Sequence, residues 1–445
     1  MRKAGQTVNE TPFNESRSKF EEYRKELYEQ FIQQQASNLS KNPKEFWKHL
    51  NQRRKSNNLP DILNFENKTA TTDQEKADLF AEYFEDVYVN HEEDEFLDSF
   101  IMNRDEENCY DLTVSQEHYV KVINAKSSLI VVSSGVGQGS VNGPLLFVVF
   151  FDDSDPLMDE IISLNFADDK KLAEFINGTE DAMQLQEGLN EFMTWCADNK
   201  MIVNEEKCKV ITFTRKRNPL IFNYTINGKQ IKRVEESMDL GVLVDKGFTF
   251  RSHYEYVTNR SISTSKFVKR QSQFFGMDTI KVIYQMLVLS ILEFSAPVWS
   301  PNYLIHRNSI ESVQKQMVLF LLGDDRRHLT QSYELPPYTE RCEQLGLITL
   351  IRRRINAIIL FIHALIIGKY QSPYLRSLIT LNPGTRIMRN PDFIKIGTHD
   401  NSPFVVACIL FNIAARHVDP TLPSGQFRTS LLRLPDDLFH RWVAL

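Results

Sequence analysis

Two adjacent aspartates, Asp168 and Asp169, form the most distinctive chemical feature of this sequence. They stand between residues 161–166 and residues 171–176, whose apolar character around a polar centre predicts a β-hairpin. Two carboxylates at a hairpin tip offer hard oxygen ligands to a divalent cation such as Mg²⁺, and the strands would fix their positions. Alone, the pair is a weak signal, because an Asp-Asp turn is more often an ordinary solvated turn.

A glycine-rich segment, GVGQGS at residues 135–140, precedes an apolar run at residues 145–151. Backbone amides of such a loop can approach a nucleotide or a template, with Gln138 and Ser140 as polar contacts. The alternative is a flexible turn. A phosphate-binding P-loop is excluded, because no Gly-Lys-Ser/Thr follows. The apolar run fits either a strand or a buried helix.

The composition of the 445 residues, 42% hydrophobic and 25% charged, is typical of a soluble protein with two or three compact units. The five cysteines are odd in number and lack metal-ligand spacing, which predicts a reduced intracellular protein without structural zinc. Residues 1–14 are polar and contain no signal peptide, and the apolar residues 357–367 are too few to span a membrane. Nucleus and cytoplasm are not distinguished.

The net charge of the chain and its local distribution point in different directions. The net charge of −6 does not favour nucleic-acid binding, which usually accompanies a basic domain. The segment 251–281 nevertheless gathers the cations Arg251, Arg260, Lys266, Lys269, Arg270 and Lys281. A local basic face is therefore compatible with the acidic total.

The N-terminal part is predicted to be helical. Residues 1–15 are expected to be a disordered lead-in. An amphipathic helix should begin at Ser18, with apolar positions at Phe20, Tyr23, Leu27 and Phe31. A second helix should have Pro43 in its first turn and an apolar stripe of Phe46, Trp47 and Leu50. Residues 52–58 are expected to be a linker, and Thr72 with Glu75 predicts a capping box at the start of a third helix.

The middle of the chain predicts strands and one helix. Residues 129–132 are β-branched, and Thr179 should open a helix. Short strand-like runs follow at residues 210–214, 220–226, 230–234 and 240–244, with Asn227-Gly228 as a tight turn. From about Ser252 the pattern is helical again. The fold class is therefore α+β, with a mixed segment at about residues 129–250 between helical segments.

Residues 135–144, GVGQGSVNGP, resemble the GVPQGSVLGP block of reverse transcriptases from jockey-like non-LTR retrotransposons. The following LLFVVFFDDSDPL resembles that family's strand leading to its next motif. FADD at residues 166–169 is similar to the family's [FY]ADD metal-binding turn, and WCADNKMIVNEEK at residues 195–207 is similar to its next block. Leu240-Gly241-Val242 resembles the LGV block, which in the family holds the primer end.

The likeness extends to both sides of these blocks and keeps the family's order. Residues 42–47 resemble the segment before the polymerase, and residues 345–354, with three consecutive arginines, resemble the helical region after it. The resemblance implies a right-hand polymerase palm with helical flanks. The expected domains are a helical extension at 1–60, a helical remnant of the polymerase N-terminal part at 61–128, a palm at 129–250, a thumb at 251–335 and a helical C-terminal region at 336–445.

The resemblance also implies a chemistry. Such enzymes copy an RNA template from a DNA primer at a nicked chromosomal target, using two Mg²⁺ ions. Asp168 would bridge both ions and Asp169 would be a weaker ligand. Lys207 would protonate the leaving pyrophosphate, although an ordinary solvated lysine is an equally good interpretation.

Substrate-binding residues follow from the same resemblance. Gln138, Gly139 and Ser140 would line the template and the incoming nucleotide, and Leu240, Gly241 and Val242 would bind the primer. No membrane partner is implied, and the oligomeric state stays open.

One essential piece of the family pattern is missing. The family places another metal-binding aspartate, and a long fingers region, well before the glycine-rich block. Between Leu112 and Ser134 the only acidic residue is Glu117. Two metal ions would then have too few anionic ligands, so we expect the chain to be inactive as a polymerase by itself.

Smaller departures point the same way. Gly137 replaces the family's proline, Asn142 replaces a leucine, and Asp239 replaces an aromatic residue. The N-terminal endonuclease domain that the family usually carries has no counterpart in these residues. The alternative to an impaired reverse transcriptase is a non-catalytic nucleic-acid-binding or scaffold protein, in which Lys266, Lys269 and Arg270 lie along a duplex backbone. A remnant without either activity is the third possibility.

Overall fold

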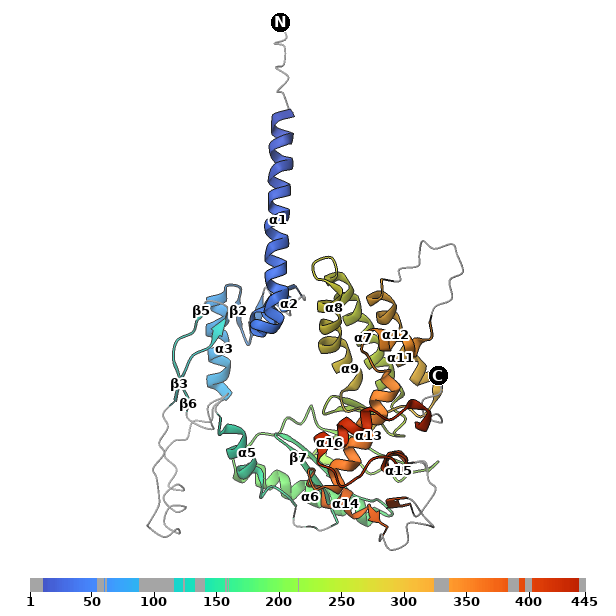
Figure 1. Ribbon diagram of the computed structural model, residues 1–445. Coiled ribbons are helices and arrows are strands. Elements are labelled where there is room, and N and C mark those ends of the chain that lie inside the picture. The colour runs from blue at the N-terminus through green and yellow to red at the C-terminus, as the bar shows by residue number, and fades with distance from the viewer. Residues whose placement is uncertain are drawn as a thin grey trace, which may run out of the picture. The chain divides into compact units, whose positions relative to one another are not determined.

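The computed structural model describes residues 11–53, 60, 62–87, 116–122, 125–132, 141–156, 158, 160–214, 216–323, 336–382, 392–396 and 402–439. The chain divides into two compact units. Residues 1–54 together with 236–445 form one, here called the helical unit, and residues 55–235 form the other, called the mixed unit. Figure 1 labels many of the elements of both.

The helical unit contains most of the helices. Its elements are α1 (Thr11–Lys41), α2 (Pro43–Arg53), β13 (Glu236–Asp239), β14 (Val242–Asp245), α7 (Arg251–Gln271), α8 (Met277–Tyr284), the π-helix η1 (Gln285–Leu289), α9 (Ser290–Glu293), α10 (Ala296–Trp299), α11 (Leu304–Leu321), α12 (Tyr338–Gln344), α13 (Leu350–Ile366), α14 (Pro373–Ser377), β15 (Thr380–Leu381), β16 (Ile394–Lys395), α15 (Pro403–Ala415), α16 (Ser424–Leu432) and the 3₁₀-helix η3 (Asp436–Phe439).

Two apolar cores hold this unit together. The first joins α1 and α2 to α7–α12 and includes Phe46, Tyr284 and Trp299. The second is built by α13, α15 and α16, which lie side by side, and includes Phe411 and Phe427. Helices whose apolar faces meet in this way gain most of their stability from packing.

The buried carboxylate of Glu311 links these helices. It accepts hydrogen bonds from the backbone N–H groups of Leu350 (2.9 Å) and Ile351 (3.0 Å), and from the hydroxyl of Tyr338 (2.5 Å). The two N–H groups belong to the first turn of α13, where a helix has no partners of its own. A carboxylate from α11 therefore caps α13.

The N-terminal expectations are confirmed in part. Helix α1 begins at Thr11, so residues 11–15 are helical and not a disordered lead-in, while residues 1–10 lie outside the described part. Pro43 opens α2, with Phe46 and Leu50 fully buried, as predicted. The apolar residues predicted for the first helix are mostly exposed, namely Phe20, Tyr23, Leu27 and Phe31. Residues 52–53 of the predicted linker belong to α2 instead, and residues 54–58 are not among those described.

The mixed unit contains short strands and three described helices. Its elements are β1 (Leu63–Phe65), β2 (Lys68–Ala70), α3 (Asp73–Val87), β3 (Gln116–His118), β4 (Lys121–Val122), β5 (Ala125–Lys126), β6 (Ile130–Val132), α5 (Gly143–Phe151), β7 (Ile162–Phe166), β8 (Asp169–Ala173), α6 (Thr179–Asp198), β9 (Lys209–Ile211), β10 (Thr225–Ile226), β11 (Lys229–Gln230) and β12 (Lys232–Val234).

Every described sheet of the mixed unit has two strands. The pairs β1–β2, β3–β6, β4–β5, β7–β8 and β10–β11 are antiparallel, and β9–β12 is parallel. The structure is thus a mixture of helices and small sheets, which agrees with the α+β expectation.

Two local predictions for the mixed unit are confirmed. The Glu75 N–H donates to Thr72 Oγ1 (3.2 Å) and the Thr72 N–H donates to Glu75 Oε2 (2.9 Å), which is the capping box of α3. Asn227 and Gly228 have φ of 49° and 75°, and form the two-residue turn between β10 and β11. Positive φ at both positions is what an Asn-Gly pair allows.

The apolar run at residues 145–151 is a helix, α5, with Pro144 in its first turn. The strand interpretation of this run, including the strand expected from the family likeness, was therefore wrong. The buried-helix alternative was also wrong in part, because only Phe151 of the run is buried while Val149 is 67% exposed. Residues 240–241 likewise form a turn, and the strand begins at Val242. No described helix combines the length and apolar composition needed to cross a membrane.

Candidate functional site

The two aspartates occupy the hairpin tip that the sequence predicts. Phe166 pairs with Asp169, so Ala167 and Asp168 form a two-residue turn between β7 and β8. Ala167 has a φ of 50°, in the left-handed region that disfavours a residue with a Cβ. Both carboxylates are exposed. Strained residues of this kind concentrate at functional sites, where the surrounding structure holds them in place.

An ion pair between the buried amine of Lys170 and the half-exposed carboxylate of Asp155 anchors one face of this hairpin. Asp155 Oδ1 accepts hydrogen bonds from Ser163 Oγ (2.7 Å), Asn165 Nδ2 (2.9 Å) and Lys170 Nζ (2.7 Å). Burial opposes ionisation of Asp155, but the bonds from Lys170, Ser163 and Asn165 outweigh it and hold its pKa below the usual value. Asp155 thereby fixes both strands beside the turn.

Lys170 is the centre of this anchor. Its side chain is only 5% exposed, and Nζ lies 5.4 Å and 5.0 Å from the ring centres of Phe151 and Phe192. Two aromatic faces thus stabilise the cation alongside Asp155. The sequence prediction missed this pair. The available signal was the alternation of polar Ser163 and Asn165 with apolar neighbours, which marks a polar face turned toward the protein.

Trp195, the first residue of the block at 195–207, joins α6 to α5. Its Nε1 donates to Asp153 Oδ1 (3.0 Å), and its ring contacts Phe150 and Phe151 at centroid distances of 5.5 Å and 5.4 Å. This residue positions the helices behind the hairpin.

Lys207 lies on an exposed turn just before β9. The Lys207 N–H donates to Asn204 Oδ1 (3.2 Å), and neighbouring Glu205 accepts bonds from Asn227 Nδ2 and Lys229 Nζ, both at 2.8 Å. Within the described residues, no hydrogen bond or ion pair joins Lys207 to either aspartate. The structure therefore fixes the backbone at Lys207, and the role of its amine stays a prediction.

The remaining predicted residues divide into two groups. Gln138, Gly139 and Ser140 lie outside the described residues. Leu240 and Gly241, with φ of 43° and 84°, form the turn between β13 and β14.

The environment of this second turn is tight. A Cβ added at Gly241 would lie 3.0 Å from Phe294 Cε1, so both the positive φ and this ring disfavour any other residue here. Val242 is 6% exposed and belongs to the first core, whereas Leu240 is exposed. Leu240 and the turn backbone are thus the parts of this block that a ligand can reach.

The donor set for a metal can be tested directly. Among the described residues, no group of three or more His, Cys, Asp or Glu side chains could hold a metal ion. Mg²⁺ requires near-octahedral oxygen ligands, and a two-metal centre needs carboxylates on both sides of the ions. Asp168 and Asp169 alone do not fit such a centre.

Exposed cations occur along α7. Arg260, Lys266 and Arg270 are all exposed, and Lys266 and Arg270, four residues apart, lie on the same face of the helix, with Arg260 about a third of a turn away. Lys269 is held differently, because its amine lies 5.3 Å from the ring centre of Phe320.

Comparison with known proteins places these features in a family. Residues 77–276 match the family model described as reverse transcriptase (RNA-dependent DNA polymerase). The matched segment includes the aspartate turn, Lys207 and the turn at Leu240. This chain therefore carries a reverse transcriptase domain.

The relatives are more specific. The chain is 28% identical over 211 residues to the RNA-directed DNA polymerase from mobile element jockey of Drosophila funebris, covering 44% of this chain and 23% of the relative. The Drosophila melanogaster jockey polymerase is 27% identical over 219 residues, covering 46% and 24%. A probable RNA-directed DNA polymerase from transposon BS of Drosophila melanogaster is 26% identical over 211 residues, covering 44% and 23%.

The chain is thus homologous to RNA-directed DNA polymerases of non-LTR retrotransposons, and the resemblance seen in the sequence is confirmed. The match spans less than a quarter of the length of each of these relatives. No solved structure matches the chain significantly.

Proposed function

We propose that this chain is a reverse transcriptase domain that keeps the aspartate turn but does not extend primers by itself. The observation that carries the proposal is the turn. Asp168 and Asp169 stand exposed on a strained hairpin that Asp155 and Lys170 anchor, and the described residues contain no group of three or more His, Cys, Asp or Glu side chains that could hold a metal ion.

The roles proposed for individual residues follow the family. Reverse transcriptases use divalent metal ions, and Asp168 is the carboxylate best placed at the tip to contact one. Asp169, at the start of β8, would be the weaker ligand. Lys207 would be the proton donor, and the residues at 138–140 and 240–242 would contact template, nucleotide and primer. In this proposal residues 129–250 are the palm and 251–335 the thumb.

The proposed impairment rests on the sequence before the glycine-rich segment. Glu117 is the only acid between Leu112 and Ser134. Without an aspartate opposite Asp168, the negative charge that would assemble two cations is incomplete. Removing ligands from a metal site lowers its affinity for the metal ion and disturbs the coordination geometry.

Primer extension tests this proposal. The purified chain is incubated with an RNA template, an annealed DNA primer, deoxynucleotides and Mg²⁺, and an Asp168→Asn variant is the matched control. We expect no extension from either protein. RNA-templated extension by the parent that disappears in Asp168→Asn would contradict the proposal. It would show that the chain is an active polymerase that uses Asp168.

A second candidate, nucleic-acid binding without synthesis, is favoured by α7. Arg260 and Arg270 are ten residues apart, which corresponds to about 15 Å along a helix. That is several phosphate spacings of a nucleic-acid backbone, so Arg260, Lys266 and Arg270 can contact successive phosphates of one strand.

Salt-dependent binding tests this candidate. The affinity of the chain for a labelled RNA–DNA duplex is measured at several salt concentrations, with Lys266→Gln/Arg270→Gln compared with Lys19→Gln/Lys25→Gln on α1. We expect the α7 variant to bind more weakly and its logarithmic salt slope to fall by about 2, one for each lost phosphate contact. Equal effects from both variants would show that binding depends only on the net charge of the protein. In that case α7 would not be the binding face.

A further inference from the structure

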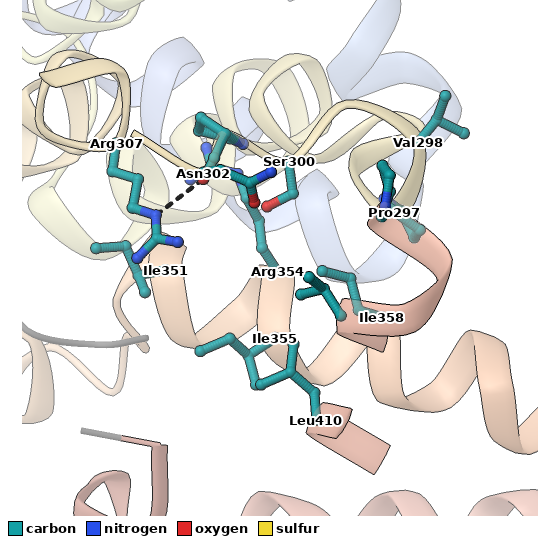
Figure 2. Close-up of a pocket in the computed structure, with 13 residues that line it drawn as sticks. Pro297, Val298, Ser300, Asn302, Arg307, Ile351, Arg354, Ile355, Ile358 and Leu410 are labelled. Atoms are coloured by element: carbon teal, nitrogen blue, oxygen red, sulfur yellow. Dashed lines mark hydrogen bonds between the residues drawn. The ribbon is translucent and has the colours of Figure 1, made fainter. Parts of the chain in front are cut away.

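The helical unit contains a small pocket where α10 and the following loop meet α13 and α15 (Figure 2). The cavity measures about 50 Å³. Ile355, Ile358 and Leu410 line one side, whereas Ser300, Asn302, Arg307 and Arg354 supply polar groups. Two arginines line this pocket, and one of them, Arg354, is buried, which is unusual for a cation unless it is paired.

Arg354 is the residue that makes the pocket distinctive. It is 3% exposed, and none of its three guanidinium nitrogens has a hydrogen-bond partner within the described part of the chain. Figure 2 shows its side chain extending from α13 toward the loop that carries Ser300 and Asn302. A buried guanidinium with five N–H groups and no acceptor is costly unless something else supplies one.

The neighbouring arginines of the same run show the contrast. Arg352 donates to the carbonyls of Leu431 (3.1 Å) and Leu434 (3.0 Å). Arg353 forms an ion pair with Glu293, with one bond of 2.9 Å. Both guanidinium groups have protein acceptors, which Arg354 lacks.

The charge of Arg354 persists in spite of its burial. Burial lowers its pKa to about 10, which still leaves the group protonated at neutral pH. The nearest acids act from a distance, because Glu311 binds Tyr338 and the start of α13 while Glu293 binds Arg353.

Two further groups set the local charge balance. The Trp299 ring lies 5.6 Å from Arg354 Cζ and offsets only part of the lost hydration. Arg307, whose Nε donates to the Pro301 carbonyl (2.8 Å), adds a second positive charge to the same pocket. The two cations repel each other, so an anion between them would relieve both the repulsion and the missing hydrogen bonds.

We propose that this pocket binds a single phosphate group, held by Arg354 and Arg307 with Ser300 and Asn302 as neutral contacts. A guanidinium fork matches the geometry of phosphate oxygens and can bind two of them at once. In this measure one water molecule needs roughly 10–15 Å³, so the cavity has room for one small oxyanion. This site is independent of the aspartate turn and of polymerase activity.

Thermal unfolding of the full chain tests the site. The Tm is measured in potassium phosphate and in potassium chloride of equal ionic strength, for the parent and for Arg354→Met. Because a ligand that binds only the folded state stabilises it by mass action, saturating phosphate should raise the parent Tm by about 4 °C. Arg354→Met should show no phosphate-specific rise, although its stability in chloride should equal or exceed that of the parent, since an apolar side chain replaces a buried charge.

Two more variants make the test specific. Arg341→Met is the matched control, because Arg341 also has guanidinium nitrogens without a hydrogen-bond partner in the described residues but does not line this pocket. It should keep the full phosphate response. Arg307→Met should lose most of that phosphate response while Arg354 remains in place. Loss of the response in two separate variants could not be explained by a folding defect in one of them.

The source of the phosphate is distinguished by a further comparison. A short oligonucleotide with a 5′-phosphate is titrated against the same oligonucleotide with a 5′-hydroxyl. A rise in Tm specific to the 5′-phosphate, lost in Arg354→Met, would identify a nucleic-acid end as the occupant, whereas a rise with inorganic phosphate alone would identify the free ion. Either result supports the site. Absence of both responses in the parent, or equal responses in parent and Arg354→Met, would overturn it.

Discussion

The helical unit and the mixed unit use their apolar residues in opposite ways. In the helical unit, helices such as α13 and α15 bury aromatic and aliphatic faces against each other, and Phe411 and Phe427 are fully buried. In the mixed unit, α5 is almost entirely apolar and yet exposes most of its residues, and the hairpin β7–β8 exposes Ile162, Leu164 and Phe166. Both apolar core clusters of the described residues belong to the helical unit.

The part of the chain that resembles the family is therefore not the part with the best-packed core. The family match ends at residue 276, so most of the well-packed helical unit lies beyond it, whereas the aspartate turn lies in the sparsely packed unit. A two-stranded sheet is marginally stable without further strands or a covering helix. The aspartate turn therefore depends on a few specific contacts, chiefly that of Asp155 with Lys170. The helical unit, by contrast, is held together by its apolar cores.

The largest expected effect comes from matched phenylalanine substitutions in the two units. Phe411→Ala removes a fully buried ring and should cost about 3–5 kcal/mol in the free energy of unfolding, through lost burial and the cavity left behind. Phe175→Ala in the mixed unit removes a ring that is 78% exposed and should cost less than about 0.5 kcal/mol. Native-state hydrogen exchange measures the opening of each unit separately. Similar costs at both positions would show that the ring of Phe175 packs against the mixed unit instead of facing solvent.

An intermediate effect is expected at Asp245, which accepts hydrogen bonds from the N–H groups of Gly247 (3.0 Å), Thr249 (3.1 Å) and Phe250 (2.6 Å). Although burial opposes ionisation, these bonds hold the pKa of Asp245 below its usual value. Asp245→Asn should cost about 2 kcal/mol at neutral pH, because an amide accepts these bonds less well than a carboxylate.

The pH dependence has a definite sign. Because the folded pKa of Asp245 is lowered, its contribution is fully present above about pH 4 and is lost as pH falls through the folded pKa. The difference in stability between parent and Asp245→Asn, followed by urea unfolding, should therefore shrink below about pH 4. A difference that stays constant down to pH 2 would mean that the carboxylate charge is not what holds the turn.

The smallest effect compares two glycines with the same backbone requirement. Gly228 and Gly241 both have positive φ, at 75° and 84°, but only Gly241 has a close neighbour, Phe294. Gly228→Ala should cost about 1 kcal/mol from backbone strain alone, and Gly241→Ala about 2 kcal/mol because the added methyl group also meets the ring. Thermal unfolding of both variants gives the difference, and equal shifts in Tm would show that Phe294 simply moves away.

Local features were predictable from the sequence where the relevant interactions are local. The capping box at Thr72, the Asn227-Gly228 turn and the helix opening at Pro43 each depend on neighbouring residues. The aspartate hairpin was also predictable, since its strands and turn are contiguous. The order of the family's sequence blocks around the turn then indicated a metal-binding role, which hydrophobic periodicity alone could not.

Long-range features were not predictable. The apolar residues of α5 look like a buried segment, because hydrophobicity does not reveal whether a covering surface exists. Lys170 looks like a solvated lysine until Asp155, Phe151 and Phe192 surround it. Arg354 cannot be distinguished from Arg352 and Arg353 by sequence, since only tertiary packing decides which of the three arginines finds an acceptor.

The account is tested most directly by single-turnover primer extension, with the chain in excess over a labelled RNA–DNA primer–template in Mg²⁺. Excess protein removes weak binding as a reason for failure, so the measurement reports on chemistry at the aspartate turn alone. We predict that the duplex is bound and that no nucleotide is added. Addition of even one templated nucleotide by the parent, abolished in Asp168→Asn, would contradict the central claim that this turn is an incomplete site.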